Sequence, residues 1–320
     1  MEEILSAKDL KKYFIRGGFS GHKDVVRAVD EISFSVKKGE TFVLAGESGS
    51  GKTTTARLIL RAIEPDAGTV IFDGVRIDNH DTALRKIRTE CQMIHQDPYA
   101  SVNPRMTVSD IVREPLDIYE IGSVKERNKQ ILEALREVKL EPAEEIAKKY
   151  PHMLSGGQRQ RVAMARSIVT RPKLVIADEP VSMLDVSVRV GILELMRELQ
   201  ERLGISFLYI THDLSTARYI GHRIAIMYRG KIVESGPIND VLLDPKHPYT
   251  QALIDSISDP NPDNLTKNKE IRIKEFSDID VYEGCRFRDR CLYAAEKCKQ
   301  EPKLETIRSD RSAACFFPLN

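Results

Sequence analysis

Residues 46–53 constrain the fold of this 320-residue chain more than any other segment. They read GESGSGKT and match the pattern G-x-x-x-x-G-K-S/T, in which glycines let backbone N–H groups turn toward phosphate oxygens. The apolar run TFVLA precedes this loop, and a helix is expected at about 52–62. Further apolar runs lie at 174–177, 205–210 and 223–228, and an amphipathic segment at roughly 186–203 separates the first two. Strands that alternate with helices predict an α/β fold with a mostly parallel sheet.

The phosphate loop supplies side chains as well as backbone groups. Lys52 is expected to reach the outer phosphates of a nucleotide, and Thr53 to offer its hydroxyl to Mg²⁺. The N-terminus of the following helix adds a partial positive charge. A glycine-rich turn capped by threonine is the alternative, which the full motif between a strand and a helix disfavours. The predicted ATP contacts in this segment are Gly46, Glu47, Ser48, Gly49, Ser50, Gly51, Lys52, Thr53 and Thr54.

An acidic pair follows the apolar run at 174–177. Asp178 is expected to hold Mg²⁺, and Glu179 to accept a proton from the water that attacks the γ-phosphate. Alone, such a pair is usually a solvated strand end. Together with the phosphate loop, it indicates nucleotide hydrolysis.

Composition excludes several classes of protein. Lys and Arg number 49 and Asp and Glu 48, for a net charge of +1, so a globally basic nucleic-acid binder is not expected. No run reaches the ~18 apolar residues of a membrane span, and the N-terminus has no apolar signal-peptide core. With 41% hydrophobic and 30% charged residues, the chain is expected to fold as a soluble cytosolic protein with a real core.

Four further segments resemble the ATP-binding-cassette ATPases, in the family's order. Residues 154–158, LSGGQ, are similar to the signature sequence, and Ser155 suits the N-cap of a helix. Gln96 lies in a Q-loop, Asp185 in a D-loop and His212 at the switch histidine. The resemblance implies a P-loop NTPase (RecA-like) core with an antiparallel β subdomain, an inserted helical subdomain at about 97–170 and a small C-terminal Cys-rich extension. It places the nucleotide-binding domain at 1–258.

The resemblance also implies how the site is assembled. Such ATPases work in pairs, with ATP between the phosphate loop of one subunit and the signature helix of the other. Catalysis would use Glu179, His212, Lys52 and Gln96, and Mg²⁺ would be held through Thr53, Gln96 and Asp178. The contacts made in trans would be Ser155, Gly156, Gly157, Gln158 and Asp185. Adenine would stack on Tyr13 or Phe14, with Phe14 favoured by its spacing.

Two segments indicate the branch of the family. Residues 96–105, QDPYASVNPR, and 247–253, HPYTQAL, are similar to ATPases of oligopeptide and dipeptide importers. This branch implies a peripheral protein at the cytoplasmic face of the membrane, with a paralogous cassette as partner and a homodimer possible in isolation. Two membrane permeases and an extracytoplasmic peptide-binding protein would complete the transporter. Nickel and oligosaccharide importers, cassette ATPases of translation or DNA repair, and a scaffold that does not cleave ATP are the alternatives.

The C-terminal cysteines form a separate pattern. Cys285, Cys291, Cys298 and Cys315 follow the spacing C-x₅-C-x₆-C-x₁₆-C. In a reducing compartment this favours a metal site over disulfides, with zinc, an iron–sulfur cluster and unligated thiols all open. The importer branch carries such cysteines around a four-iron–four-sulfur cluster. A linker is expected at 259–283 and the cysteine module at 284–320, remote enough that ATP hydrolysis would survive loss of the cluster. Cys91 is expected to be merely buried.

Overall fold

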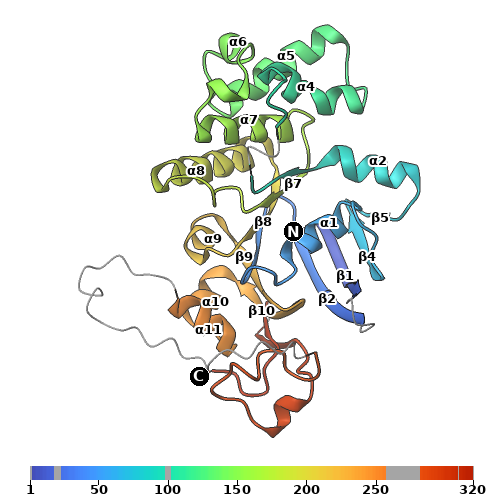
Figure 1. Cartoon of the computed structure of the whole chain (residues 1–320), viewed down its shortest axis with the longest axis vertical. Helices are drawn as coiled ribbons and strands as arrows, with labels where there is room; N and C mark the ends of the chain where they lie inside the picture. The colour runs from blue at the N-terminus through green and yellow to red at the C-terminus, as the bar shows by residue number, and fades with distance from the viewer. Residues whose placement is uncertain (1, 18–22, 98–101, 257–281, 309, 320) are drawn as a thin grey trace, which may run out of the picture.

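The computed structural model describes residues 2–17, 23–97, 102–256, 282–308 and 310–319. Part of the Q-loop segment, 98–101, and nearly all of the predicted linker at 259–283 lie outside these ranges. The described residues form two sheets, one of eight strands and one of four. Figure 1 shows a layer of helices at one end of the long axis and the C-terminal segment at the other.

The larger sheet is parallel at its centre and has the strand order β11-β12-β10-β9-β3-β8-β7-β6. Strands β3, β6, β7, β8 and β9 pair in parallel, whereas β9–β10, β10–β12 and β11–β12 pair antiparallel. The bounds are β3 (Thr41–Ala45), β6 (Cys91–Ile94), β7 (Leu174–Asp178), β8 (Ser206–Thr211), β9 (Arg223–Tyr228), β10 (Lys231–Pro237), β11 (Glu305–Arg308) and β12 (Arg311–Ala313).

The smaller sheet is antiparallel, with the order β2-β1-β4-β5. Its strands are β1 (Glu3–Gly17), β2 (Lys23–Lys37), β4 (Ala67–Phe72) and β5 (Val75–Ile77). Its buried side chains share one core with helix α1 (Lys52–Ile59) and one face of the larger sheet; Phe72, Leu58 and Leu44 represent the three elements. The predicted α/β architecture with an antiparallel β subdomain is thereby confirmed.

The central strands are apolar throughout because both faces of the sheet are covered. Val43 and Val175 point into a core with the helices, whereas Leu44 and Ile176 point into the core beneath the antiparallel sheet. Strand side chains alternate between faces, so a sheet buried on both sides needs a continuous apolar run. This is why the strands lack the alternation of a half-buried sheet.

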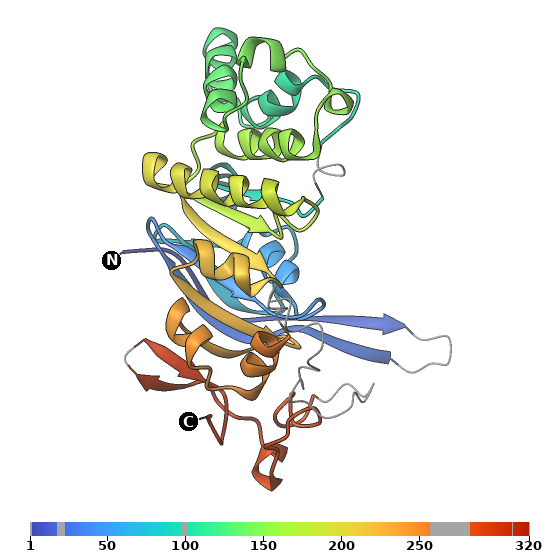
Figure 2. The ribbon, with the colours of Figure 1, turned by 90° about the vertical axis from the view of Figure 1, so that its left-hand side faces the viewer.

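The other regular elements of the described residues are helices. Helices α4 (Val108–Ile118), α5 (Val124–Glu137), α6 (Ala143–Ile146) and α7 (Gly156–Ile168) form the layer at one end, as Figure 2 also shows. Thr107, Ser123 and Ser155 each begin a helix with a capping box, which satisfies backbone N–H groups that would otherwise lack partners. The other helices are α2 (Asp81–Glu90), α8 (Val186–Leu203), α9 (Leu214–Ile220), α10 (Ile238–Leu243), α11 (Pro248–Asp255) and the short 3₁₀ turns η1 (Pro151–Met153) and η3 (Glu296–Lys299).

The C-terminal segment joins the larger sheet. Strand β12 pairs with β10, so the cysteine-rich region does not form an extension that stands apart from the core. An ion pair strengthens this junction: Arg311 Nη2 lies 2.9 Å from Glu234 Oε1, and their side chains are 3% and 0% exposed. Glu234 also accepts hydrogen bonds from the backbone N–H groups of Lys246 and His247.

We predict that Arg311→Met lowers the free energy of unfolding by about 3–5 kcal/mol, because the Glu234 carboxylate would stay buried without its cation. Urea denaturation measures the change. Arg308→Met is the matched control, since Arg308 lies exposed on β11 of the same hairpin and its loss is expected to cost less than about 0.5 kcal/mol. Equal effects of the two substitutions would contradict the importance of the buried pair.

Candidate nucleotide site

The phosphate loop connects β3 to α1, and two glycines fix its path. A Cβ atom on Gly46 would lie 2.1 Å from the carbonyl oxygen of Met227, and one on Gly51 would lie 2.0 Å from that of Ala28. Both glycines also have positive φ values, 153° and 107°. No other residue fits either position without displacing backbone, so glycine is required here on steric grounds.

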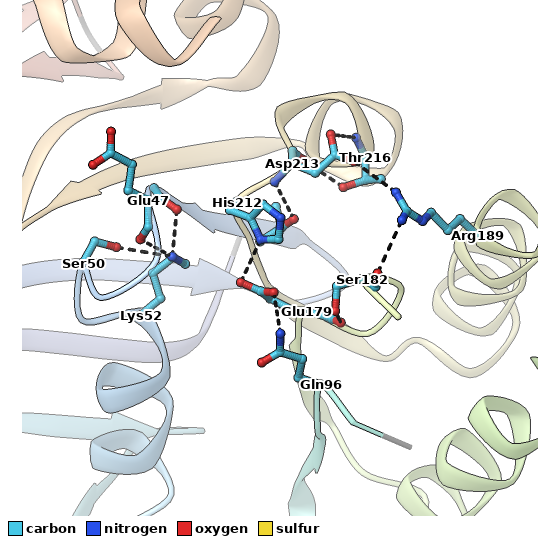
Figure 3. A network of polar contacts seen from close by, with 12 residues as sticks. Glu47, Ser50, Lys52, Gln96, Glu179, Ser182, Arg189, His212, Asp213 and Thr216 are labelled. Carbon is cyan, nitrogen blue, oxygen red and sulfur yellow. Dashed lines mark hydrogen bonds and ion pairs between the residues drawn. The ribbon is translucent and has the colours of Figure 1, made fainter. Parts of the chain in front are cut away.

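Lys52 lies inside the loop that precedes it. Its ammonium group donates to the carbonyl oxygens of Gly46 and Glu47, each at 2.8 Å, and its side chain is buried (Figure 3). Burial lowers the pKa of Lys52, while the Glu179 and Asp178 carboxylates act in the opposite direction. A cation held against the loop at the start of a helix is suited to bind phosphate oxygens.

Gln96, Glu179 and His212 meet at one edge of the sheet. Gln96 Nε2 donates to Glu179 Oε2 at 3.0 Å, and His212 Nδ1 lies 2.9 Å from Glu179 Oε1 (Figure 3). The three residues follow β6, β7 and β8, whose carboxyl ends share this edge. Glu179 has a φ of 47°, a left-handed conformation that is uncommon outside glycine and often occurs at functional sites. The structure thus brings together three of the four predicted catalytic residues directly.

The predicted magnesium ligands provide oxygen atoms. The Thr53 hydroxyl hydrogen-bonds to the Asp178 carboxylate, which is 5% exposed. Burial raises the pKa of Asp178, and the bond from Thr53 and the charge of Lys52 oppose this rise. A carboxylate beside a hydroxyl is a donor set that suits Mg²⁺, which takes oxygen ligands and usually retains several waters.

The signature residues lie elsewhere in this chain. Ser155 caps α7: its hydroxyl accepts from Gln158 N at 3.3 Å, and Gln158 Oε1 accepts from Ser155 N at 3.0 Å. Gly156 begins the helix, and a Cβ on Gly157 would lie 2.7 Å from Val188 of α8. In both ribbon views α7 belongs to the helical layer, across β7 from the phosphate loop. The signature residues therefore do not join the phosphate loop of their own subunit.

The segment that resembles a D-loop is connected to Glu179. The Ser182 hydroxyl donates to the carbonyl oxygen of Glu179 at 3.0 Å, and Asp185 is the N-cap of α8. Arg189, which sequence reasoning missed, donates to the carbonyl oxygen of Leu184 at 2.8 Å. Nothing in the sequence distinguishes Arg189 from other helical arginines, so the sequence alone could not identify it.

Comparison with known proteins agrees with this geometry. The family model described as ABC transporter matches residues 29–182, and the one described as Oligopeptide/dipeptide transporter, C-terminal region, matches 233–298. The oligopeptide transport ATP-binding protein AppF of Bacillus subtilis is 42% identical over 99% of this chain and 98% of its own length. The chain belongs to the ABC transporter family. Its predicted ATPase character is confirmed.

Two further known proteins are similar to this chain. The dipeptide transport ATP-binding protein DppF of Haemophilus influenzae is 39% identical over 98% of this chain and 96% of its own length. A dimeric ATP-binding cassette solved in a post-hydrolysis state with ADP and Pi is 31% identical, with a TM-score of 0.64, over 73% of this chain and 98% of the cassette. Among the described residues, no helix of this ABC ATPase has the length and apolar character needed to cross a membrane.

Tyr13 and Phe14, the two candidates for adenine stacking, differ in their surroundings. The Tyr13 hydroxyl donates to the Asp30 carboxylate, and burial together with this bond raises the pKa of Tyr13 to about 12. Phe14 is 41% exposed, with the Lys12 ammonium 5.8 Å from its ring centroid. Phe14 thus has the more accessible ring for stacking.

Sequence reasoning missed two residues that touch the phosphate loop. Arg290 forms two bonds to the Glu47 carboxylate, at 3.0 and 3.2 Å. The Tyr249 hydroxyl accepts from Glu47 N at 2.9 Å. Tyr249 lies on α11, whereas Arg290 belongs to the cysteine module, so the expectation that this module lies remote from the phosphate loop is wrong.

The four C-terminal cysteines line one small cavity, together with His247. None of the five cysteines forms a disulfide. Burial raises the pKa of Cys285 to about 11, and the other three thiols of the group act in the same direction. Their side chains are not arranged as a formed metal site: within the described ranges, no three His, Cys, Asp or Glu side chains are placed to hold a metal ion.

We predict that Phe14→Ala raises the dissociation constant of MgADP roughly two- to tenfold, because an aromatic stack contributes about 0.5–1.5 kcal/mol beyond its buried area. Isothermal titration calorimetry measures the constant. Tyr13→Phe is the control, because it removes only the hydroxyl that Asp30 holds. Unchanged affinity for MgADP in Phe14→Ala would contradict the assignment of Phe14.

Proposed function

We propose that this chain binds and hydrolyses ATP to energise a peptide importer, and that Glu179 is the general base. The contacts of Glu179 with Gln96 and His212 carry this proposal. The Glu179 carboxylate lies between the Gln96 amide and the His212 imidazole. Lys52 begins α1 at the same edge of the sheet. A carboxylate in this position accepts a proton from the attacking water.

Each neighbouring residue has a separate role in this proposal. Lys52 binds the outer phosphates, and His212 holds the γ-phosphate in position for attack by the water. Gln96 orients that water, and it also faces the side of the protein that would contact the permease. Mg²⁺, held through Asp178, Thr53 and Gln96, would neutralise charge on the phosphate oxygens. The residues of this chain therefore supply positioning, proton acceptance and electrostatic stabilisation.

The position of the signature helix supports a dimeric site. Ser155, Gly156, Gly157 and Gln158 begin α7 away from their own phosphate loop, so the positive end of this helix is suited to the γ-phosphate of a partner subunit. Asp185 would contribute from the same partner. A paralogous cassette is the proposed partner, and a homodimer the form expected in isolation. Hydrolysis would then require closure of the dimer.

The transported molecule and the membrane partners follow from the branch of the family. The match to the oligopeptide/dipeptide C-terminal region supports peptides as substrates, with nickel or oligosaccharides as the second choice. A groove that includes His95, the neighbour of Gln96 in the sequence, is also lined by Pro115 of α4, by Tyr119 just after α4 and by Arg166 of α7. We assign this groove to the permease, so the protein would lie at the cytoplasmic face of the membrane. Two permeases and an extracytoplasmic peptide-binding protein would complete the importer.

We predict that Glu179→Gln slows ATP hydrolysis roughly 10²–10⁴-fold, because the water loses its base while the phosphate contacts remain. A phosphate-release assay measures the rate, and calorimetry tests that MgADP still binds. Glu201→Gln is the matched control, because Glu201 lies exposed on α8 away from the site. Near-normal turnover of the Glu179→Gln protein would overturn the assignment of the base.

We further propose that Cys285, Cys291, Cys298 and Cys315 hold a four-iron–four-sulfur cluster. Their convergence on one cavity supports this proposal, since four thiolates are the usual ligand set of such a cluster. The raised thiol pKa values mean that ligation would displace protons, as metal binding by cysteine generally does. Zinc is the second candidate, because it also accepts four thiolates.

Protein purified without oxygen is predicted to be brown and to contain iron and labile sulfide in comparable amounts. Cys298→Ser is expected to lose both, because one ligand is gone. Cys91→Ala should keep them, since Cys91 lies buried in β6. Metal analysis and visible absorption make the comparison. A colourless protein with one zinc per chain would contradict the iron–sulfur assignment.

A further inference from the structure

The loop 286–290, between the first two cysteines of the module, contacts the phosphate loop on one side and strand β2 on the other. On one side Arg290 pairs with Glu47, the second residue of the phosphate loop, through two bonds of 3.0 and 3.2 Å. On the other side Arg286 pairs with Asp30, which holds the Tyr13 hydroxyl. Arg286 also donates to the carbonyl oxygen of Arg229. This loop therefore joins the cysteine module to the phosphate loop and to β2.

Phe287 fixes the loop between these two arginines. Its ring is 2% exposed and lies 5.4 Å from the rings of Tyr228 and Tyr249. Tyr249 in turn accepts a hydrogen bond from the backbone N–H of Glu47 at 2.9 Å. A buried aromatic cluster thus holds the loop and the phosphate loop against each other. Because such clusters are closely packed, displacement of Phe287 would disturb Glu47 as well.

The charge of Glu47 determines how loss of its ion pair with Arg290 would affect nucleotide binding. Glu47 belongs to a loop whose ligand is a polyphosphate, so its carboxylate repels that ligand. Arg290 is 15% exposed and makes a bidentate contact that neutralises the carboxylate. Glu47 is 42% exposed, so water screens part of this interaction. Loss of the arginine leaves an uncompensated negative charge beside bound phosphates, which weakens nucleotide binding.

We propose that Arg290 is a positioning residue for nucleotide binding, and that the loop 286–290 couples the ordered state of the cysteine module to the phosphate loop. This inference rests on the proposed ATP site. Arg290 acts by neutralising Glu47, while Phe287 and Arg286 hold the loop in place. The coupling is reciprocal, so bound nucleotide also stabilises the module.

The first test is the affinity for MgADP, measured by isothermal titration calorimetry on the full chain. Arg290→Gln should raise the dissociation constant roughly two- to fivefold, the range expected for a partly exposed ion pair. Arg288→Gln is the matched control: Arg288 lies in the same loop, but its side chain contacts Asp289 and the carbonyl oxygen of Glu283. It should bind MgADP as the unmodified protein does. Unchanged affinity in Arg290→Gln would overturn the proposal.

A second variant separates this charge effect from simple damage to the fold. Glu47→Gln removes the carboxylate that Arg290 neutralises, so adding it to Arg290→Gln should restore most of the affinity. A merely structural role for Arg290 predicts no recovery, and that result would overturn the role of the charge. These measurements detect binding alone, so they stand apart from the hydrolysis rate that tests Glu179.

The third test addresses the coupling to the module. Cys298→Ser removes a cysteine that lines the cavity without placing any change in the loop 286–290. It should weaken MgADP binding about as much as Arg290→Gln does, and the two changes together should weaken it no further. Iron content and melting temperature are recorded for each protein. Full MgADP affinity in a Cys298→Ser protein that has lost its metal would overturn the coupling.

Discussion

The parallel pairing of β6, β7 and β8 is the constraint on which the rest of the site depends. Because these strands run in the same direction, the residues that follow them meet at one edge, and Glu179 contacts Gln96 and His212 at 3.0 and 2.9 Å. The same strands place alternate side chains in two different cores. A one-residue shift would exchange these cores and displace Glu179 from its partners. The packing of the two cores and the contacts of Glu179 therefore depend on the same strand register.

The phosphate loop depends on both sheets. Met227, whose carbonyl oxygen approaches Gly46, belongs to β9 of the larger sheet, and Ala28, which approaches Gly51, belongs to β2 of the smaller one. The loop thus passes between two backbones at distances that only glycine allows. The antiparallel sheet therefore contacts the phosphate loop and also packs against the core.

Sequence predicted the parts of the structure that are encoded locally. The strand, loop and helix around Lys52 follow from an apolar run and a glycine motif, and the α/β class follows from their alternation. The contact between Glu47 and Arg290 joins residues 243 positions apart, and a charged pair at that separation leaves no periodic signal. The three-residue strand β12 is likewise too short to show a pattern. Choosing between Tyr13 and Phe14 required their exposure, because neighbours on a strand point to opposite faces.

Buried charges make the C-terminal region and the nucleotide-binding core depend on one another. Arg311 pairs with Glu234, which binds the backbone of His247; His247 is the N-cap of α11, which carries Tyr249 to the phosphate loop. A buried carboxylate is tolerated only with its partners in place, and here the cation comes from the C-terminal hairpin. Removing that hairpin would leave Glu234 charged and unpaired beside the start of α11. The position of Tyr249, and through it the backbone at Glu47, therefore rests on the last strand of the chain.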